Sequence, residues 1–134
     1  MMKRVFFWSS IYGVVCASLF AQEPNIENYL LQIQRGEAAS VQAELPSLLK
    51  QYPNNPGIQY VQGMLTTDGA EAVRIYQTIV DNYPKSEWAD DALFKVYKFY
   101  QAIGLHRTAE IKLNQLKTSY IAERAELEIE FGKP

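Results

Sequence analysis

The stretch Ser86–Tyr120, SEWADDALFKVYKFYQAIGLHRTAEIKLNQLKTSY, decides the fold. Apolar residues recur at helical spacing on both sides of Gly104, which interrupts the pattern. Ser86 is suited to cap the first of the two helices that this spacing predicts. The apolar stripes are Ala89, Ala92, Leu93, Val96, Tyr97 and Tyr100, then Ala109, Leu113, Leu116 and Tyr120. Two amphipathic helices joined by a glycine turn form an αα-hairpin, which cannot bury its apolar face alone.

A similar hairpin is predicted at the start of the helical region. It begins at Ile26, turns at Gly36 and ends at Tyr52-Pro53. Pro46 lies inside its second apolar stripe, where it removes a backbone donor and crowds the preceding turn. The sequence therefore predicts either a kink at Pro46 or a helix that starts late there.

The middle hairpin is the shortest of the three. Its first helix is predicted over about Pro56–Leu65, with Asn55 as the N-cap and a proline at the first helical position. Asp68, followed by Glu71, has the spacing of a capping box at the start of the next helix. That helix has the cleanest apolar face of the chain, formed by Ala72, Ile75, Tyr76, Ile79, Val80 and Tyr83.

The period of these hairpins resembles that of the tetratricopeptide repeat. The signature of that repeat runs W-x2-L-G-x2-Y, then A-x3-F, then P, over about 34 residues. The hairpins end at Tyr52, Tyr83 and Tyr120, which are 31 and 37 residues apart and bracket this period. In the last hairpin the signature positions fall on Leu93, Val96, Tyr97, Tyr100, Ala109 and Leu113, with Ile121 in place of proline. The resemblance implies an all-α, right-handed α-solenoid of about three helical hairpins.

The end of the sequence is predicted to form a C-terminal capping helix over Ala122–Phe131. Apolar Ala125, Leu127 and Ile129 are interspersed with glutamates, so one side can pack on the last hairpin while the other faces water. Helical-repeat arrays need such a polar end. The finish at Gly132-Lys133-Pro134 leaves open a natural terminus or a repeat array cut short.

The first 21 residues have the layout of a secretory signal peptide. Lys3 and Arg4 precede a run without charged side chains, and Gln22 opens a polar stretch. We therefore predict a signal peptide over residues 1–21, cleaved after Ala21, and a helical repeat domain over residues 22–134. Such a protein is exported, and is periplasmic or associated with the outer membrane.

Three alternatives concern the same N-terminal segment. Cleavage after Ala17 is one, and an uncleaved anchor is another, because the 17 uncharged residues come close to the roughly 18 to 20 that span a bilayer. Lipid attachment at Cys16 is the third and the least favoured, since lipid-attachment sites prefer a small residue where Val15 stands. Cys16 is the only cysteine, so the domain from Gln22 onward must be held by packing without disulfides.

Composition argues against several classes of function. Removal of residues 1–21 leaves a net charge near −4, which disfavours nucleic acid or an anionic membrane surface as a partner. His106 is the only histidine and no cysteine follows residue 21, so neither transition-metal binding nor a cysteine nucleophile is supported. The acidic pair Asp90-Asp91 is explained by the favourable helix dipole. We expect no enzyme, no cofactor and no small-molecule substrate.

The segment Tyr83–Ala92, YPKSEWADDA, narrows the resemblance further. It is similar to a subgroup of exported bacterial tetratricopeptide proteins that includes the Tol-Pal accessory protein and the lipoprotein that scaffolds β-barrel assembly. The resemblance covers residues 55–131 well and residues 25–54 loosely. It implies a protein that binds other proteins of the cell envelope, in envelope assembly or in division coordination.

The predicted binding surface is the side of the first helix of Ser86–Tyr120 that points away from its core stripe. In stacked hairpins the first helix of each repeat lines the concave side. The candidate protein-binding residues are Asp91, Phe94, Lys95, Lys98 and Gln101. An exposed Phe94 beside two lysines can anchor an extended peptide or a helix. In the alternative interpretation, Phe94 and Phe99 pack against neighbouring helices.

Two further hypotheses differ from a scaffold that binds other proteins. In the first, an apolar patch pairs with its own copy, so that the protein is a self-associating structural or assembly subunit of an envelope complex. In the second, the N-terminal segment is retained and the protein is a membrane-anchored adaptor.

Overall fold

The computed structural model describes the backbone of residues 23–131 and the side chains of residues 23–119. All elements in this part of the chain are α-helices, and it contains no strand, which confirms the predicted all-α class. The predicted signal peptide and the residues from 132 onward lie outside the described residues. The helices are α1 (Ile26–Gln34), α2 (Ala38–Gln51), α3 (Pro56–Leu65), α4 (Gly69–Asn82), α5 (Glu87–Ala102) and α6 (His106–Phe131).

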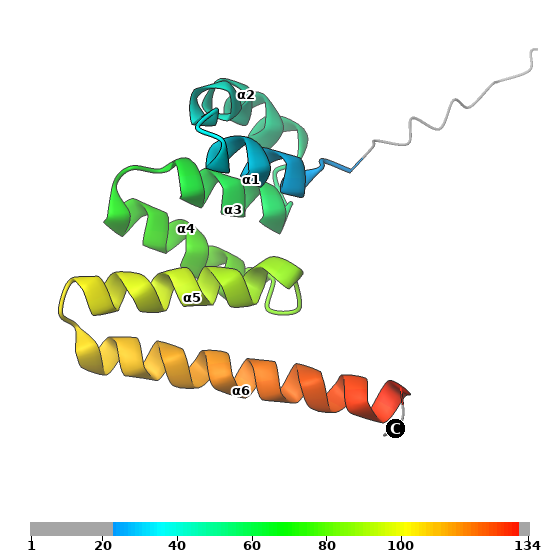
Figure 1. Ribbon diagram of the computed structural model, residues 1–134, viewed down its shortest axis with the longest axis vertical. Helices are drawn as coiled ribbons and strands as arrows, with labels where there is room; N and C mark the ends of the chain where they lie inside the picture. The colour runs from blue at the N-terminus through cyan, green and yellow to red at the C-terminus, as the bar shows by residue number, and fades with distance from the viewer. Residues whose placement is uncertain (1–22, 132–134) are drawn as a thin grey trace, which may run out of the picture.

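The helices lie in successive layers along the long axis of the molecule (Figure 1). Each helix contacts the next one in sequence, and α3 also contacts both α1 and α5. Contacts between neighbours in sequence, together with contacts between alternate helices, are those expected of stacked hairpins. The solenoid itself, its handedness and its assignment as a tetratricopeptide array stay predictions.

Polar side chains define where four of the helices begin. Asn25, Asn55 and Asp68 each accept a hydrogen bond from the backbone amide three residues later, at 3.0, 3.0 and 2.9 Å. Ser86 Oγ accepts one from the amide of Trp88 at 3.2 Å. These bonds satisfy amides that have no partner within the helix. The caps predicted at Asn55, Asp68 and Ser86 are confirmed.

Two glycine turns close the first and last hairpins in the same way. Gly36 and Gly104 have φ angles of 86° and 79°, in the left-handed region that favours glycine. In both turns the amide of the following residue donates to the carbonyl five residues before it, at 2.9 Å. This is the Schellman arrangement, which satisfies the last carbonyls of α1 and α5.

Helix α2 contains a proline in its interior. It runs without a break from Ala38 to Gln51 with Pro46 inside it, so the late helix start predicted at this proline is wrong. Pro46 itself is exposed, whereas Val41, Leu45 and Leu48 on the opposite side are buried. Burial of this apolar face stabilises the helix in spite of the missing amide. The kink at Pro46 stays a prediction.

The end of the chain differs from the prediction. Helix α6 continues from His106 to Phe131, so Ala122–Phe131 does not form a capping helix of its own. The reason lies at Ile121, which allows the helix to continue where the repeat signature has a proline. The alanines and glutamates that follow are also strong helix formers. As a result α6 has 26 residues, against 16 in α5.

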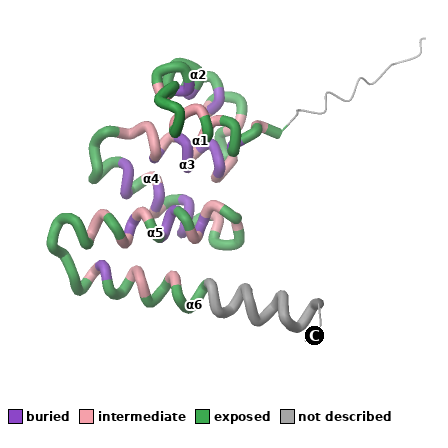
Figure 2. The backbone as a smooth tube through the Cα atoms, in the orientation of Figure 1, coloured by how far each residue is buried: buried purple, intermediate pink, exposed green. Residues whose placement is uncertain are grey.

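Two clusters of buried residues form the core. One joins α3, α4 and α5 around Tyr76, Ile79 and Leu93, and the other joins α1, α2 and α3 around Val41 and Ile58. Leu30 and Trp88 pack against both clusters and so connect them. Figure 2 shows the buried positions on the sides of the helices that face one another, while the connections are mostly exposed. Among residues 23–119, tyrosines are the only buried residues whose side chains carry a polar group.

Within residues 23–131, no helix is both long enough and apolar enough to cross a membrane.

Candidate protein-binding surface

The predicted binding residues lie on the outward side of α5. Asp91, Phe94, Lys98 and Gln101 are exposed, and Lys95 is half-buried. The opposite side of the helix is buried in the core through Ala89, Ala92, Leu93 and Val96. The exposure expected from the helical spacing is therefore confirmed for all of these residues except Lys95, and a role of the five in binding stays a prediction.

Phe94 is the large apolar side chain of this surface. It is 46% exposed, and its ring lies 5.9 Å from that of Tyr97, at an interplanar angle of 38°. Phe99, in contrast, packs against the core. Its ring also lies close to Gly69, the first residue of α4: a Cβ atom added to this glycine would lie 3.1 Å from the ring. The packing interpretation therefore holds for Phe99, whereas Phe94 leaves nearly half of its surface free.

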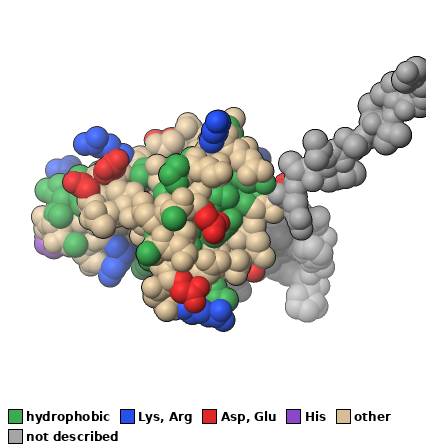
Figure 3. All heavy atoms as spheres, turned by 90° about the horizontal axis from the view of Figure 1, so that it is seen from above, with side chains coloured by type: hydrophobic (Ala, Val, Ile, Leu, Met, Phe, Trp, Pro, Cys, Tyr) green, Lys and Arg blue, Asp and Glu red, His purple; other side chains and the backbone are tan. Residues whose placement is uncertain are grey.

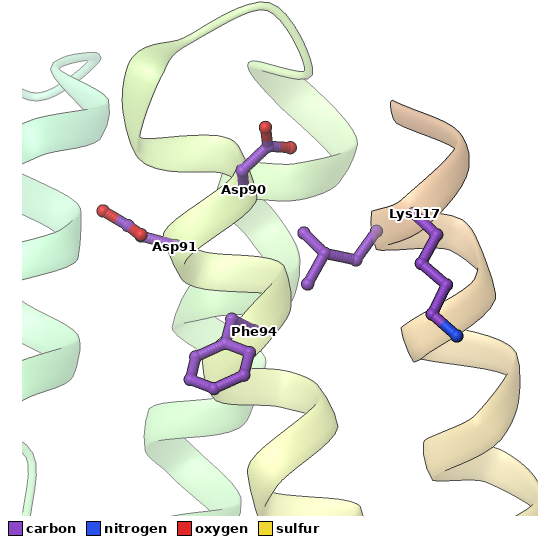
Figure 4. Close-up of a pocket in the computed structure, with 5 residues that line it drawn as sticks. Asp90, Asp91, Phe94 and Lys117 are labelled. Carbon is purple, nitrogen blue, oxygen red and sulfur yellow. The ribbon is translucent and has the colours of Figure 1, made fainter. Parts of the chain in front are cut away.

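Phe94 is one of the residues that line an open groove of about 340 Å³ along α5 and α6, and Figure 4 shows that the Asp91 side chain points to the side of α5 away from α6. Asp90, Asp91 and Phe94 line the groove from α5, and Leu116 and Lys117 line it from α6. We call these five residues the α5–α6 groove. Its centre is apolar, with two carboxylates on one helix and an ammonium group on the other.

Three residues of the groove were not among the binding residues predicted from the sequence. Asp90 was explained there by the helix dipole, Leu116 was placed in the core stripe, and Lys117 was not considered. The signal that identifies them is the hairpin itself: Asp91 lies 13 residues before Gly104 and Lys117 lies 13 residues after it. Antiparallel helices joined at Gly104 bring these positions level with each other. The other three predicted residues, Lys95, Lys98 and Gln101, do not line the groove.

The charges of the groove have no ionic partner inside the described part of the chain. Among the side chains of residues 23–119, no carboxylate oxygen lies within 4.0 Å of a lysine or arginine nitrogen. Asp90, Asp91 and Lys117 therefore do not neutralise one another, although all three line the same groove. Each of these charges remains available to a molecule that enters it.

An aromatic cluster fixes the start of α5 and hence the acidic side of the groove. The ring of Tyr60 in α3 lies 5.5 Å from that of Tyr76 in α4 and 5.4 Å from that of Trp88 in α5. Burial, and after it the negative charge of Asp91, raises the pKa of Tyr60 to about 12. Burial also raises the pKa of Tyr76. The two phenols therefore stay neutral, and their rings serve to pack the three helices together.

A second hollow, of about 170 Å³, is formed by residues of α2, α3, α4 and the α2–α3 connection, among them Leu49, Pro53 and Ile75. Gln59 supplies its distinctive polar group. The side-chain nitrogen of Gln59 donates to the Pro53 carbonyl at 3.2 Å, and its Oε1 is buried without a hydrogen-bond partner. One acceptor without a charge offers much less to a ligand than the α5–α6 groove does.

The described residues contain no group of three histidine, cysteine, aspartate or glutamate side chains that are placed to hold a metal ion. On the face seen in Figure 3, acidic and basic side chains are interspersed and do not form a patch of one sign.

Comparison of the chain with known protein families, with curated proteins and with solved structures finds no match. Its function is therefore inferred from its own sequence and surface.

Proposed function

We propose that this chain is a non-enzymatic scaffold of the bacterial cell envelope that binds other proteins through the outward side of α5. The observation that carries the proposal is Phe94, a large apolar side chain that is 46% exposed on a helix whose other strongly apolar side chains face the core. The proposed mechanism is the rigid presentation of a surface, without turnover, cofactor or small-molecule substrate.

The energetic argument starts from the exposed part of Phe94. Full burial of such a side chain contributes about 1.5–3 kcal/mol, so a partner that covers the exposed half gains about 1 kcal/mol from this residue. Lys98 and Gln101 follow on the same side of α5 and are exposed. An aromatic anchor surrounded by polar side chains is a common composition of the centre of a protein interface.

The proposed compartment depends on residues 1–21 and on the resemblance of the repeat region to exported tetratricopeptide proteins. Intact-mass measurement of the protein recovered from the envelope fraction tests it. A mass equal to that of a chain beginning at Gln22 supports an exported scaffold cleaved after Ala21. A mass that retains residues 1–21 favours the membrane-anchored adaptor instead.

Binding is tested by comparing variants of the proposed surface with matched variants elsewhere. The chain is immobilised and incubated with a solubilised envelope extract, and the retained proteins are then purified for affinity measurement. Phe94→Ala and Lys98→Glu are each expected to weaken binding about fivefold, which corresponds to about 1 kcal/mol. The matched controls are Leu31→Ala, which removes another exposed apolar side chain, and Lys50→Glu on α2.

The controls are expected to bind as the unmodified chain does. Equal retention by all four variants contradicts a binding surface on α5. Equal loss in all four indicates a general effect of the substitutions and contradicts it as well.

A further inference from the structure

The α5–α6 groove carries both members of a charge pair on opposite sides. The carboxylates of Asp90 and Asp91 lie on α5, the ammonium group of Lys117 lies on α6, and the apolar side chains of Phe94 and Leu116 contribute to the same lining. Figure 4 shows Lys117 on the helix across from the three labelled α5 residues. Neither charge is paired within the described side chains. The groove therefore offers a donor and an acceptor to whatever covers it.

A surface with this composition is complementary to itself. In a two-fold symmetric dimer the same patch is used by both copies, so each patch must contain the complement of its own charges. If the second copy is related to the first by a 180° rotation about an axis through the apolar centre, the acidic side of each groove faces the basic side of the other. The dimer then has two equivalent charge contacts. We infer that the α5–α6 groove is covered by the α5–α6 groove of a second copy of this chain.

Charge balance favours a second copy over a ligand of one sign. A basic segment would pair with Asp90 and Asp91 but would place its charge near Lys117, and an acidic segment would meet the reverse difficulty. A charge that loses water without gaining a partner opposes binding. In each contact the second copy places one ammonium group against two carboxylates, so opposite charges meet on both sides of the groove, and it covers Phe94 at the same time.

The inference goes beyond the proposed scaffold and competes with it for Phe94, which the second copy would cover, so variants at Lys98 and Lys117 are needed to tell the two apart. Lys98 and Gln101 do not line the groove, so a partner can use them without the second copy. Lys117 lines the groove and is absent from the proposed binding surface on α5. Because the groove is small, we expect a reversible dimer that forms as the protein concentration rises.

A charge swap divided between two variants tests the two-fold geometry. The first variant carries Asp90→Lys and Asp91→Lys, and the second carries Lys117→Asp. In a dimer of either variant with itself, like charges face each other in both contacts. In the mixed dimer, the introduced lysines face the introduced aspartate in one contact, and the other contact is native. Mixing the two variants is therefore expected to restore the dimer that each alone has lost.

Sedimentation velocity over a range of concentrations measures the dimer dissociation constant, and native mass spectrometry identifies mixed dimers by their mass. Each variant alone is expected to dimerise at least about tenfold more weakly than the unmodified chain. The equimolar mixture is expected to recover the affinity to within about threefold, as mixed dimers. Lys98→Glu is the matched control, and its dimerisation is expected to be unchanged.

Folding of the variants is checked by far-UV circular dichroism, since Asp90 lies in the first turn of α5 and supports its dipole. Lys117→Asp does not touch that turn, so it tests the inference even where the double variant is unstable. An unmodified chain that stays monomeric at every concentration overturns the inference. So does a Lys117→Asp variant that dimerises as tightly as the unmodified chain, or a mixture of folded variants that fails to recover.

Discussion

At the scale of single residues, Gly57 shows how closely the helices approach. A Cβ atom at this position of α3 would lie 2.5 Å from Cγ1 of Ile26, the first residue of α1. It would also lie 2.9 Å from Nε1 of Trp88 in α5. The missing side chain therefore allows two other helices to meet α3 at one point, next to the residue that connects the two core clusters.

Gly57→Ala is expected to lower the free energy of unfolding. Overpacking costs about 1–3 kcal/mol, and the gain in helix propensity is only about 1 kcal/mol. Urea unfolding of the single variant, and of the same substitution in an Ile26→Ala background, measures the effect. We expect the penalty to shrink in that background, because the closest atom is removed. A penalty of equal size in both backgrounds would contradict the steric explanation.

Tyr60 gives the fold a dependence on alkaline pH. Its pKa is raised from 10.0 to about 12, first by burial and second by Asp91. Between these values the unfolded chain loses the phenolic proton while the folded chain retains it, so the stability contributed by neutral Tyr60 is lost as pH rises. Tyr60→Phe keeps the ring and removes the titrating group. Its melting temperature is expected to fall less between about pH 9 and about pH 12 than that of the unmodified chain.

At the scale of secondary structure, the helix boundaries were largely predictable because local chemistry determines them. The helix expected over Pro56–Leu65 is found with those bounds, since Asn55 and the proline after it define its start. The end of α6 was not predictable in the same way. Periodicity showed where a repeat should stop, but a helix stops only where a residue breaks it, and Ile121 does not.

The candidate site was predicted in part for a related reason. Exposure on one helix follows from the spacing of its own residues, so the outward position of Phe94 could be read from α5 alone. The groove depends on how two helices are paired, which the spacing within α5 does not contain. Lys117 enters only when α6 is aligned against α5 about Gly104.

Pro46 provides a test of how α2 is held. A proline inside a helix lowers the free energy of unfolding by about 3 kcal/mol. Proline also restrains the unfolded chain, and this opposite effect raises the free energy of unfolding by up to about 1 kcal/mol. Pro46→Ala is therefore expected to raise the free energy of unfolding by about 2 kcal/mol, measured by urea unfolding. Pro56→Ala is the matched control, because a proline at the first helical position replaces no helical hydrogen bond. An unchanged or lower stability of Pro46→Ala would contradict this account.

At the scale of the whole molecule, the helices around the two core clusters differ in how extensively they contact their neighbours. Helix α5 has extensive contacts with α4 and with α6, whereas α1 and α2 meet each other and α3 over fewer residues. Stacked hairpins interact mainly with their neighbours, so opening can begin at one end and leave the rest folded. The connection through Leu30 and Trp88 limits how far such opening spreads.

Hydrogen exchange followed by mass spectrometry is expected to reveal this difference. Amides of α1 and α2 should exchange faster than those in the middle of α4 and α5, because fewer packed side chains oppose their opening. Trp88→Ala is expected to lower the protection of both clusters, since this side chain packs against each of them. Uniform exchange across all four helices would show that the chain opens as a single unit.

The lack of ion pairs among side chains 23–119 has a consequence for how the molecule responds to ionic strength. Raising NaCl from about 0.1 M to about 1 M shortens the screening length from roughly 10 Å to roughly 3 Å. The melting temperature is expected to change little, because packing and not charge pairing holds the helices together. Association through Asp90, Asp91 and Lys117 is expected to weaken over the same range. Salt is thus expected to weaken the association of two molecules without unfolding either of them.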